Sequence, residues 1–392
     1  MKLSVIKYLC LISIALFIWR CNSKEKDVLK SANEINMFQN PEADSTIKYA
    51  KRFSISENNI CKIIYLFGNL NINDTSATFI IAKDSTTVFP DKKNTFVLKQ
   101  SCKKIASLSS VYSSMITELG EINKIVAIEN VDYYNNALIL NKFNSKNLIE
   151  LSKGPELDVE QTLLLKPDII FSFGMGNSPS AANEKIIRAN IPIVVAVDHL
   201  EENPLARAEW IKFFAAFVNK ARKADSIFAE VEKNYDALKK IAASVDSKPT
   251  VFTEIKFGEI WYVPGGKSFM ANFINDAGGS YIWNDNEKTG SLNLGFEEVY
   301  VKAKNADFWL NQALVKTKAE LLSLEKRYSD FRAFKIGNLY NNIKNTNNKG
   351  YSDYWETGIM YPNRILSDLI QIFHPELKAQ IKNDLYYYKK LN

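Results

Sequence analysis

The sequence predicts an α/β protein of two doubly wound lobes that are joined by a single long helix, with a ligand cleft between the lobes. Two stretches share one order of parts, namely an acidic helix start, an apolar helix and an aspartate that opens an apolar strand. They are residues 157–173 and 296–312. A helix–strand unit that recurs about 140 residues later indicates two similar lobes.

The first 21 residues have the pattern of an export signal. A short apolar run, residues 8–19, follows two lysines and is too short to span a membrane. It leads directly to Cys21, as in a bacterial lipoprotein signal, although Arg20 stands where a small residue is usual. We expect lipidation at Cys21; a signal cleaved elsewhere or an uncleaved anchor is the alternative. Residues 22–50 are polar and are expected to form a flexible tether.

Composition allows two domains and argues against several classes of protein. About 370 residues follow the signal, enough for two hydrophobic cores. The net charge of +6 is spread along the chain without an arginine-rich run, so nucleic acid is not an expected partner. After the signal, the cysteines are Cys61 and Cys102. An oxidising compartment would allow a disulfide between them, and two buried free thiols are the alternative.

Residues 51–203 are expected to form the first lobe. Alternating apolar patterns over residues 51–100 predict an antiparallel ribbon. Strand and helix patterns then alternate, which predicts a parallel sheet. The expected strands are residues 104–108, 124–130, 168–173 and 191–197, and the expected helices are residues 109–120, a helix capped by Asp158, and residues 181–190.

The clearest helical pattern covers residues 204–247. Inward positions from Trp210 to Ala242 are spaced alternately by four and three residues. An unbroken helix of roughly 40 residues would be about 60 Å long, which suits a rod between two lobes. A break near Asn219 into two helices is the alternative.

Residues 248–392 are expected to form the second lobe. A strand at residues 250–255 precedes a loop at 258–268 and a helix that ends in a glycine pair. The second helix–strand module follows. The remaining expected elements are a turn and strand at residues 332–340 and closing helices at 362–373 and 375–391.

Motifs of enzymes and metal sites are incomplete in this sequence. Pro264–Ser268 resembles the end of a phosphate-binding loop, but Trp261 stands where the first glycine is required. The chain has no G-x-S-x-G elbow, and its two histidines, His199 and His374, are too few for a dedicated metal centre. We therefore expect no enzyme, no metal site and no resident cofactor.

Candidate ligand contacts lie in loops after the predicted strands, where open α/β sheets bind ligands. Large side chains recur in these loops, where burial is difficult, so we expect some of them to face a ligand. The candidates are Tyr112, Tyr133, Met175, Trp261, Tyr262, Tyr354 and Trp355.

The ordered set of motifs resembles the class III periplasmic binding proteins of ABC importers, which carry ferric siderophores, haem or cobalamin. The resemblance lies within about residues 100–385 and is carried by KKIASLSSVYSSMITELG, KIVAIENVDYY, VEQTLLLKPDII, SFMANFINDAGGSYIW and RILSDLIQIFHPEL. It departs from the family in the longer ribbon of residues 51–100 and in SSVYSS, where a serine–proline sequence is commoner.

The resemblance implies a ligand held between two lobes and one surface glutamate per lobe that docks on the permease. By motif these are Glu160 and Glu297, with Glu298 as an alternative. It further implies a monomeric lipoprotein, anchored in the periplasm of a Gram-negative bacterium, that delivers an iron chelate, haem or cobalamin to an ABC permease dimer. The alternative function is a surface-exposed lipoprotein that binds a partner protein without transport.

Overall fold

The computed structural model describes residues 42–43, 46–68, 74–84, 86–151, 157–173, 181–381 and 383–392. The predicted signal with Cys21, most of the predicted tether and the candidate contact Met175 lie outside these ranges. Within them, no helix has both the length and the apolar character that a membrane span requires.

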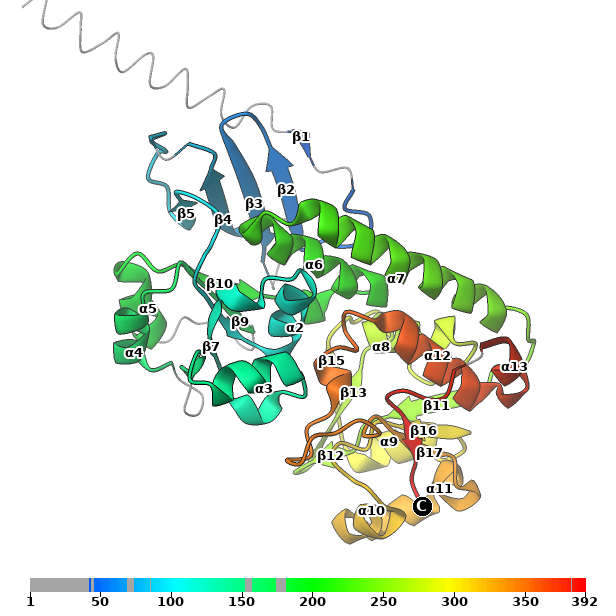
Figure 1. Ribbon diagram of the computed structural model, residues 1–392. Helices are drawn as coiled ribbons and strands as arrows, with labels where there is room; N and C mark the ends of the chain where they lie inside the picture. Colours follow the sequence, from blue (N-terminus) through cyan, green and yellow to red (C-terminus); the bar gives the residue numbers. More distant parts are fainter. Residues whose placement is uncertain are drawn as a thin grey trace, which may run out of the picture.

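A parallel five-stranded sheet forms the centre of the first lobe (Figure 1). Its strand order is β10-β9-β6-β7-β8, and every neighbouring pair is parallel, which confirms the predicted doubly wound sheet. The elements are β6 (Ile105–Leu108), α2 (Ser110–Glu118), β7 (Ile125–Ile128), α3 (Ala137–Asn144), β8 (Ile149–Glu150), α4 (Val159–Leu165), β9 (Ile169–Phe173), α5 (Ala181–Arg188) and β10 (Ile193–Ala196).

The second lobe has a similar central sheet. Its order is β14-β11-β16-β17-β18, in which the first four strands are parallel and β18 is antiparallel to β17. The elements of this sheet and its helices are β11 (Thr250–Thr253), α8 (Phe269–Asp276), β14 (Ser280–Tyr281), α9 (Phe296–Ala303), β16 (Phe308–Leu310), α10 (Lys318–Leu324), α11 (Arg332–Ile336), β17 (Leu339–Asn341), α12 (Pro362–Phe373), α13 (Lys378–Ile381) and β18 (Lys389–Lys390).

Two predictions for the second lobe are wrong. The expected loop at residues 258–268 contains β13 (Ile260–Pro264), which pairs with β12 (Lys256–Phe257) and β15 (Ser291–Leu294) in a small antiparallel sheet. Its alternate residues are buried, the period of a half-buried strand. The expected helix at residues 375–391 ends with α13, because the buried Asp368 carboxylate accepts hydrogen bonds from the backbone amides of Tyr386, Tyr387 and Tyr388.

An additional sheet precedes the central sheet of the first lobe, at the top of Figure 1. It contains β1 (Glu42–Ala43), β2 (Phe53–Glu57), β3 (Cys61–Phe67), β4 (Thr75–Ala82) and β5 (Thr95–Leu98). The pairs from β1 to β4 are antiparallel as predicted, whereas β5 is parallel to β4. This sheet packs on the helix that follows the first lobe through edge-on ring contacts, Phe53 with Trp210 at 5.2 Å and Phe79 with Phe217 at 5.5 Å.

The predicted joining rod is two helices, so the single helix over residues 204–247 is wrong and the break at Asn219 is confirmed. α6 (Pro204–Val218) ends where Asn219 adopts the left-handed conformation, with φ 58°. Asparagine tolerates this conformation well at the end of a helix. α6 is buried along its whole length and belongs to the core. α7 (Ala221–Ala242) starts directly afterwards.

α7 is the helix that joins the lobes. In Figure 1 it runs from the first-lobe side to α12 of the second lobe, against which it packs. Its 22 residues correspond to about 33 Å of helix. Tyr235 donates a hydrogen bond to Asp276 Oδ2 at 2.9 Å, and Lys239 pairs with Asp276 Oδ1 at 2.7 Å. The joining helix is therefore fixed to the end of α8.

The two repeated modules use their acidic residues in the same way. Glu160 and Glu297 are each the second residue of a helix, α4 and α9. Asp168 precedes β9 and accepts hydrogen bonds from the amides of Lys103 and Lys104, just before β6. Asp307 precedes β16 and accepts from the amide and hydroxyl of Thr250, the first residue of β11. Each aspartate therefore ties the start of one strand to the start of its neighbour.

Of the two states left open for Cys61 and Cys102, the structure has two free, buried thiols and not a disulfide. Cys102 belongs to the main core, whereas Cys61 packs with Ile63 and Ile80 in a separate small cluster of the additional sheet. Burial raises the pKa of both thiols. They serve as small apolar core residues.

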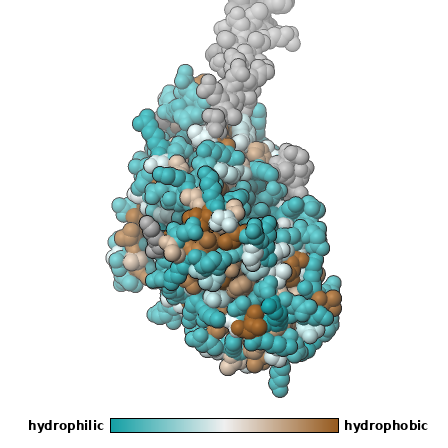
Figure 2. Space-filling model, turned by 90° about the vertical axis from the view of Figure 1, so that its right-hand side faces the viewer, coloured by the Kyte–Doolittle hydropathy of each residue, from teal (hydrophilic) through white to brown (hydrophobic). Residues whose placement is uncertain are grey.

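The surface is mainly hydrophilic on the side shown in Figure 2, where hydrophobic side chains form separate patches.

α7 has the amphipathic pattern of a helix with one face in the core. Its buried positions include Ala224, Phe228, Val231 and Tyr235, spaced by three or four residues, and the positions between them are largely polar.

Candidate functional site

The two lobes touch along a seam, which we define as residues 129–136 of the first lobe and 345–357 of the second. The Asn347 side-chain amide donates to the carbonyl oxygens of Asp132 at 2.8 Å and Tyr134 at 3.1 Å. The rings of Tyr133 and Tyr351 meet edge-on at 4.7 Å. The seam follows β7 and β17, at the carboxyl ends of the two central sheets.

Glu356 is the charged residue most deeply buried in the seam, with 1% of its surface exposed. Its carboxylate accepts hydrogen bonds from the backbone amides of Asn135 at 2.5 Å and Asn136 at 3.2 Å. Burial outweighs these bonds and raises the pKa of Glu356 to about 7. The sequence gives no sign of this contact, because its donors are backbone groups of the other lobe.

Three candidate ligand contacts are exposed, as predicted. The exposed fractions are 37% for Tyr133, 42% for Tyr262 and 49% for Trp355. Tyr133 and Trp355 lie in the seam, whereas Tyr262 lies in β13. Exposed aromatic rings at the end of a parallel sheet can stack on a planar or apolar ligand.

Three other candidates are fully buried, so the expectation that they lie exposed at loop tips is wrong. Tyr112 is inside α2, and its hydroxyl donates to Asp198 at 2.8 Å. Trp261 is an inward-facing residue of β13, and its indole donates to the Thr253 carbonyl at 3.2 Å. Tyr354 packs edge-on against Tyr387 and Tyr388. The three side chains are core residues that support the site.

A buried ion pair also lies between the lobes. Arg207 of α6 donates to Asp198 at 2.7 and 3.2 Å, and both side chains are almost fully buried. The Arg207 guanidinium also lies over the ring of Phe269, 4.3 Å from its centre, at the start of α8. Because α6 packs on α2 of the first lobe and α8 of the second, this cation is held between the lobes.

His199 follows the same buried aspartate. Its ring lies 4.7 Å from the ring of Phe173, the last residue of β9. Burial lowers the pKa of His199, which favours the neutral imidazole at pH 7. Its Nδ1 has no hydrogen-bond partner among the described residues.

Two acidic residues follow strands at the same sheet ends. Glu129 follows β7, and burial raises its pKa to about 7. Glu254 follows β11, and burial raises its pKa to about 8. Acids with raised pKa values often mark functional sites.

The glutamates assigned to docking lie outside the seam. Glu160 is exposed on α4. The Glu297 side chain is 77% exposed and pairs with Arg327 at 2.9 Å. Glu298 accepts a hydrogen bond from the Gly295 amide at 2.7 Å and thereby caps α9. The Glu298 side chain is therefore used in capping α9, and the exposed Glu297 is the better docking candidate.

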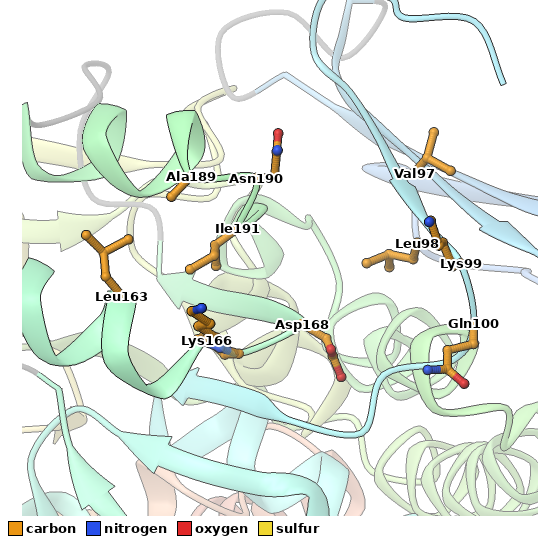
Figure 3. A pocket seen from close by; sticks show the side chains of 11 residues that line it. Val97, Leu98, Lys99, Gln100, Leu163, Lys166, Asp168, Ala189, Asn190 and Ile191 are labelled. Carbon is orange, nitrogen blue, oxygen red and sulfur yellow. The ribbon is translucent and has the colours of Figure 1, made fainter. Parts of the chain in front are cut away.

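A pocket of about 440 Å³ lies at the opposite end of the first sheet (Figure 3). Its walls come from β5 and the segment after it, including Gln100, and from the ends of α4 and α5. Asp168 and Ile191 in its wall precede β9 and β10. The pocket is therefore at the amino ends of the strands, away from the edge where such sheets bind ligands.

Comparison with known families decides the classification. Residues 105–342 match the family model described as periplasmic binding protein. The chain belongs to this family. Its members bind ligands rather than catalyse reactions, and the additional sheet lies before the matched region.

Curated relatives in Methanocaldococcus jannaschii include two uncharacterized lipoproteins. One is 28% identical over 236 residues, which is 58% of this chain and 53% of the relative. The other is 30% identical over 246 residues, 61% of this chain and 60% of the relative. The chain thus spans less than two thirds of the length of these relatives.

Solved structures of periplasmic binding proteins share the fold. A periplasmic heme-binding protein from Roseiflexus sp. RS-1, in apo form, covers 70% of this chain and 98% of its own at 19% identity, with a TM-score of 0.54. A component of an ABC-type Fe3+-hydroxamate transport system from Saccharomonospora viridis covers 71% and 95% at 12% identity, with a TM-score of 0.56. These likenesses confirm the predicted two-lobe α/β class.

Proposed function

We propose that this protein is the substrate-binding lipoprotein of an ABC importer and captures an iron chelate, either a ferric siderophore or haem, or cobalamin. The observation that carries the proposal is the seam. There the carboxyl ends of parallel strands from the two central sheets of a periplasmic binding protein meet, beside the exposed rings of Tyr133 and Trp355. Structural neighbours with heme and Fe3+-hydroxamate in their names support this class of cargo.

We further propose that Glu160 and Glu297 dock the loaded protein on the permease dimer. Each is exposed at the second position of its helix, and the two helices occupy corresponding positions in the repeated modules. An acid at this position is favoured by the helix dipole, and a carboxylate can form a charge-assisted hydrogen bond with an arginine of the permease.

Lipidation at Cys21 would hold the protein in the cell envelope, in the periplasm of a Gram-negative bacterium, and residues 22–50 would serve as the tether. The relatives named as lipoproteins support an anchor. The proposed division places the first lobe at residues 51–203, the joining segment at 204–247 and the second lobe at 248–392. The protein would act as a monomer.

The test is titration of the full-length chain, purified in detergent, with ferric hydroxamate and catecholate siderophores, haemin and cobalamin. We expect one of them to quench tryptophan fluorescence by way of Trp355, since this indole is exposed. Trp355→Phe should remove most of the quenching, whereas the buried Trp283→Phe should leave it. Calorimetry that detects no binding of any of these compounds would refute the proposal.

A further inference from the structure

Two adjacent strands of the second lobe end in an unusual backbone conformation. Glu254 after β11 has φ 66° and Asn311 after β16 has φ 59°. Residues other than glycine and asparagine seldom adopt this left-handed conformation, which costs a glutamate about 1–2 kcal/mol. The Trp309 indole donates to the Glu254 carbonyl at 2.7 Å, and the Glu254 amide donates to the Leu310 carbonyl at 3.0 Å. The surrounding structure therefore fixes the position of Glu254.

The Glu254 side chain belongs to a polar network with Asn311 and Tyr388. The Asn311 side-chain amide donates to Glu254 Oε1 at 3.4 Å, and the Tyr388 hydroxyl donates to Asn311 Oδ1 at 2.8 Å. Burial raises the pKa of Tyr354; Glu254 adds to this effect and Arg207 opposes it. Tyr354 thus lies close to both Glu254 of the second lobe and Arg207 of α6.

Glu254 has no ion-pair partner among the described residues, and its one side-chain hydrogen bond there is long. A partly buried acid is normally paired with a cation or fully hydrogen-bonded. The Glu254 carboxyl group is therefore available to pair with a cation of a bound ligand.

Two buried polar groups at the same sheet end also have unfilled hydrogen-bonding capacity. Gln312 Oε1, two residues after β16, and Asn342 Nδ2, one residue after β17, are buried without a hydrogen-bond partner among the described residues. The residues are 0% and 4% exposed. Each unfilled buried group costs about 1–3 kcal/mol. These two residues and Glu254 follow three adjacent strands, β11, β16 and β17.

The first lobe presents an acid as well. Glu129 follows β7, is partly buried and has no ion pair among the described residues. The buried cation of this region, Arg207, is already engaged by Asp198 and by the ring of Phe269. The sheet ends that face the seam therefore offer one acid on each side with a raised pKa. A cationic cargo would favour the ionised form of these acids, whereas a polyanionic cargo would oppose it.

We propose that Glu254 contacts the cargo and selects for a metal chelate that carries positive charge. This inference rests on the proposed function and adds the charge of the cargo to it. A cationic chelate would stabilise the ionised Glu254 carboxylate, because an opposite charge favours the charged form of an acid. Without a cation beside it, the raised pKa keeps this group largely protonated at pH 7, close to the side chains of Tyr281, Tyr354 and Tyr388. Binding should therefore release a proton to the buffer.

The test compares three ferric chelates by calorimetry on the full-length chain in detergent: a cationic trihydroxamate, a neutral trihydroxamate and a trianionic triscatecholate. Wild type should bind the cationic chelate most tightly and release a proton, measured in two buffers of different ionisation enthalpy. Glu254→Gln should weaken the cationic complex about ten-fold, the effect of losing one charge-assisted hydrogen bond, change the neutral one by less than about three-fold and abolish proton release. Glu259→Gln, whose side chain is 95% exposed, is the matched control.

The outcomes separate this inference from the function on which it rests. Tightest binding of the trianionic chelate, or an unchanged charge preference in folded Glu254→Gln, overturns the role of Glu254 and leaves the proposed function intact. Failure of all three chelates, haemin and cobalamin to bind overturns both. Thermal unfolding of each variant verifies that it is folded, and Glu254→Ala serves as a second variant if the glutamine protein is unstable.

Discussion

The Glu356 carboxylate of the second lobe accepts a hydrogen bond of 2.5 Å from the backbone amide of Asn135 in the first lobe. A second bond comes from the amide of Asn136, whose own side chain caps α3. The Glu356 carboxylate of the second lobe thus accepts its hydrogen bonds from the backbone just before α3 of the first lobe. If the lobes separated, water would replace these hydrogen bonds and would solvate the carboxylate. The contact between the lobes and the ionisation of Glu356 therefore depend on each other.

Glu356→Gln should change how stability depends on pH. The folded pKa of about 7 lies above the ordinary value of 4.5, so the folded state binds the Glu356 proton more tightly than the unfolded state. This contribution to stability is complete below about pH 4.5 and is lost as the pH rises through about 7. Wild type should therefore lose about 2 kcal/mol of stability between pH 5 and about pH 8 that the Glu356→Gln variant does not lose, so the pH profile of the variant should be flatter.

The measurement is urea unfolding of both proteins at several pH values. Glu287→Gln, whose side chain is 82% exposed, should keep the wild-type pH profile. Parallel profiles for wild type and Glu356→Gln would show that Glu356 ionises with an ordinary pKa in the folded protein.

Sequence periodicity predicted the central elements of both lobes, because buried parallel strands and amphipathic helices have strong local patterns. The cap at Asp158 and the alternation from β6 to β10 are examples. The break at Asn219 interrupts no apolar spacing, so periodicity alone could not separate α6 from α7. β13 was missed because its glycine-rich continuation has the composition of a loop.

The candidate site was harder to predict than the fold. An aromatic residue after a strand has the same local sequence whether it is exposed, as Trp355 is, or buried, as Tyr354 is. Tertiary packing decides between the two, since the ring of Tyr354 lies against Tyr387 and Tyr388, just before β18. Glu254 and Glu356 were missed because their environments are assembled from several segments, and a single acid in a loop carries no pattern.

Glu160→Ala combined with Glu297→Ala should abolish uptake of the cargo in cells and leave its affinity for the purified protein unchanged. Both side chains are exposed and lie outside the seam, so neither is expected to touch the cargo. Transport assays with cells and calorimetry with the purified chain measure the two effects. Glu259→Ala combined with Glu287→Ala is the matched control, since the side chains of these glutamates are also largely exposed. Loss of cargo affinity in the Glu160 and Glu297 variant would place these residues at the binding site instead.

Asp198→Asn should destabilise the protein by about 3–5 kcal/mol, because it leaves the buried Arg207 guanidinium without a counter-ion. Asp198→Asn combined with Arg207→Met should cost clearly less, since the unpaired charge is then absent. Urea unfolding at pH 7 measures both. An Asp198→Asn protein as stable as wild type would show that the pair is hydrated rather than buried.

Asp307→Asn should cost more stability than Asp168→Asn, although the two aspartates have the same role. Asp307 is partly buried and also pairs with Arg332, whereas Asp168 is exposed. Burial acts to raise the pKa of Asp307, but the hydrogen bonds from Thr250 and the contact with Arg332 outweigh it, so the pKa is lowered. We expect losses of about 2 kcal/mol at Asp307 and about 1 kcal/mol at Asp168 at pH 7.

The contribution of the Asp307 charge should be present above its unfolded pKa and be lost as the pH falls through the lowered folded pKa. The difference between wild type and Asp307→Asn should therefore shrink in acid, which unfolding at pH 7 and about pH 3 can measure. Asp246→Asn, at an exposed position before β11, should match wild type at both pH values. Equal losses at Asp168 and Asp307 would mean that the strand-to-strand hydrogen bonds alone, and not burial or Arg332, determine how much each module contributes.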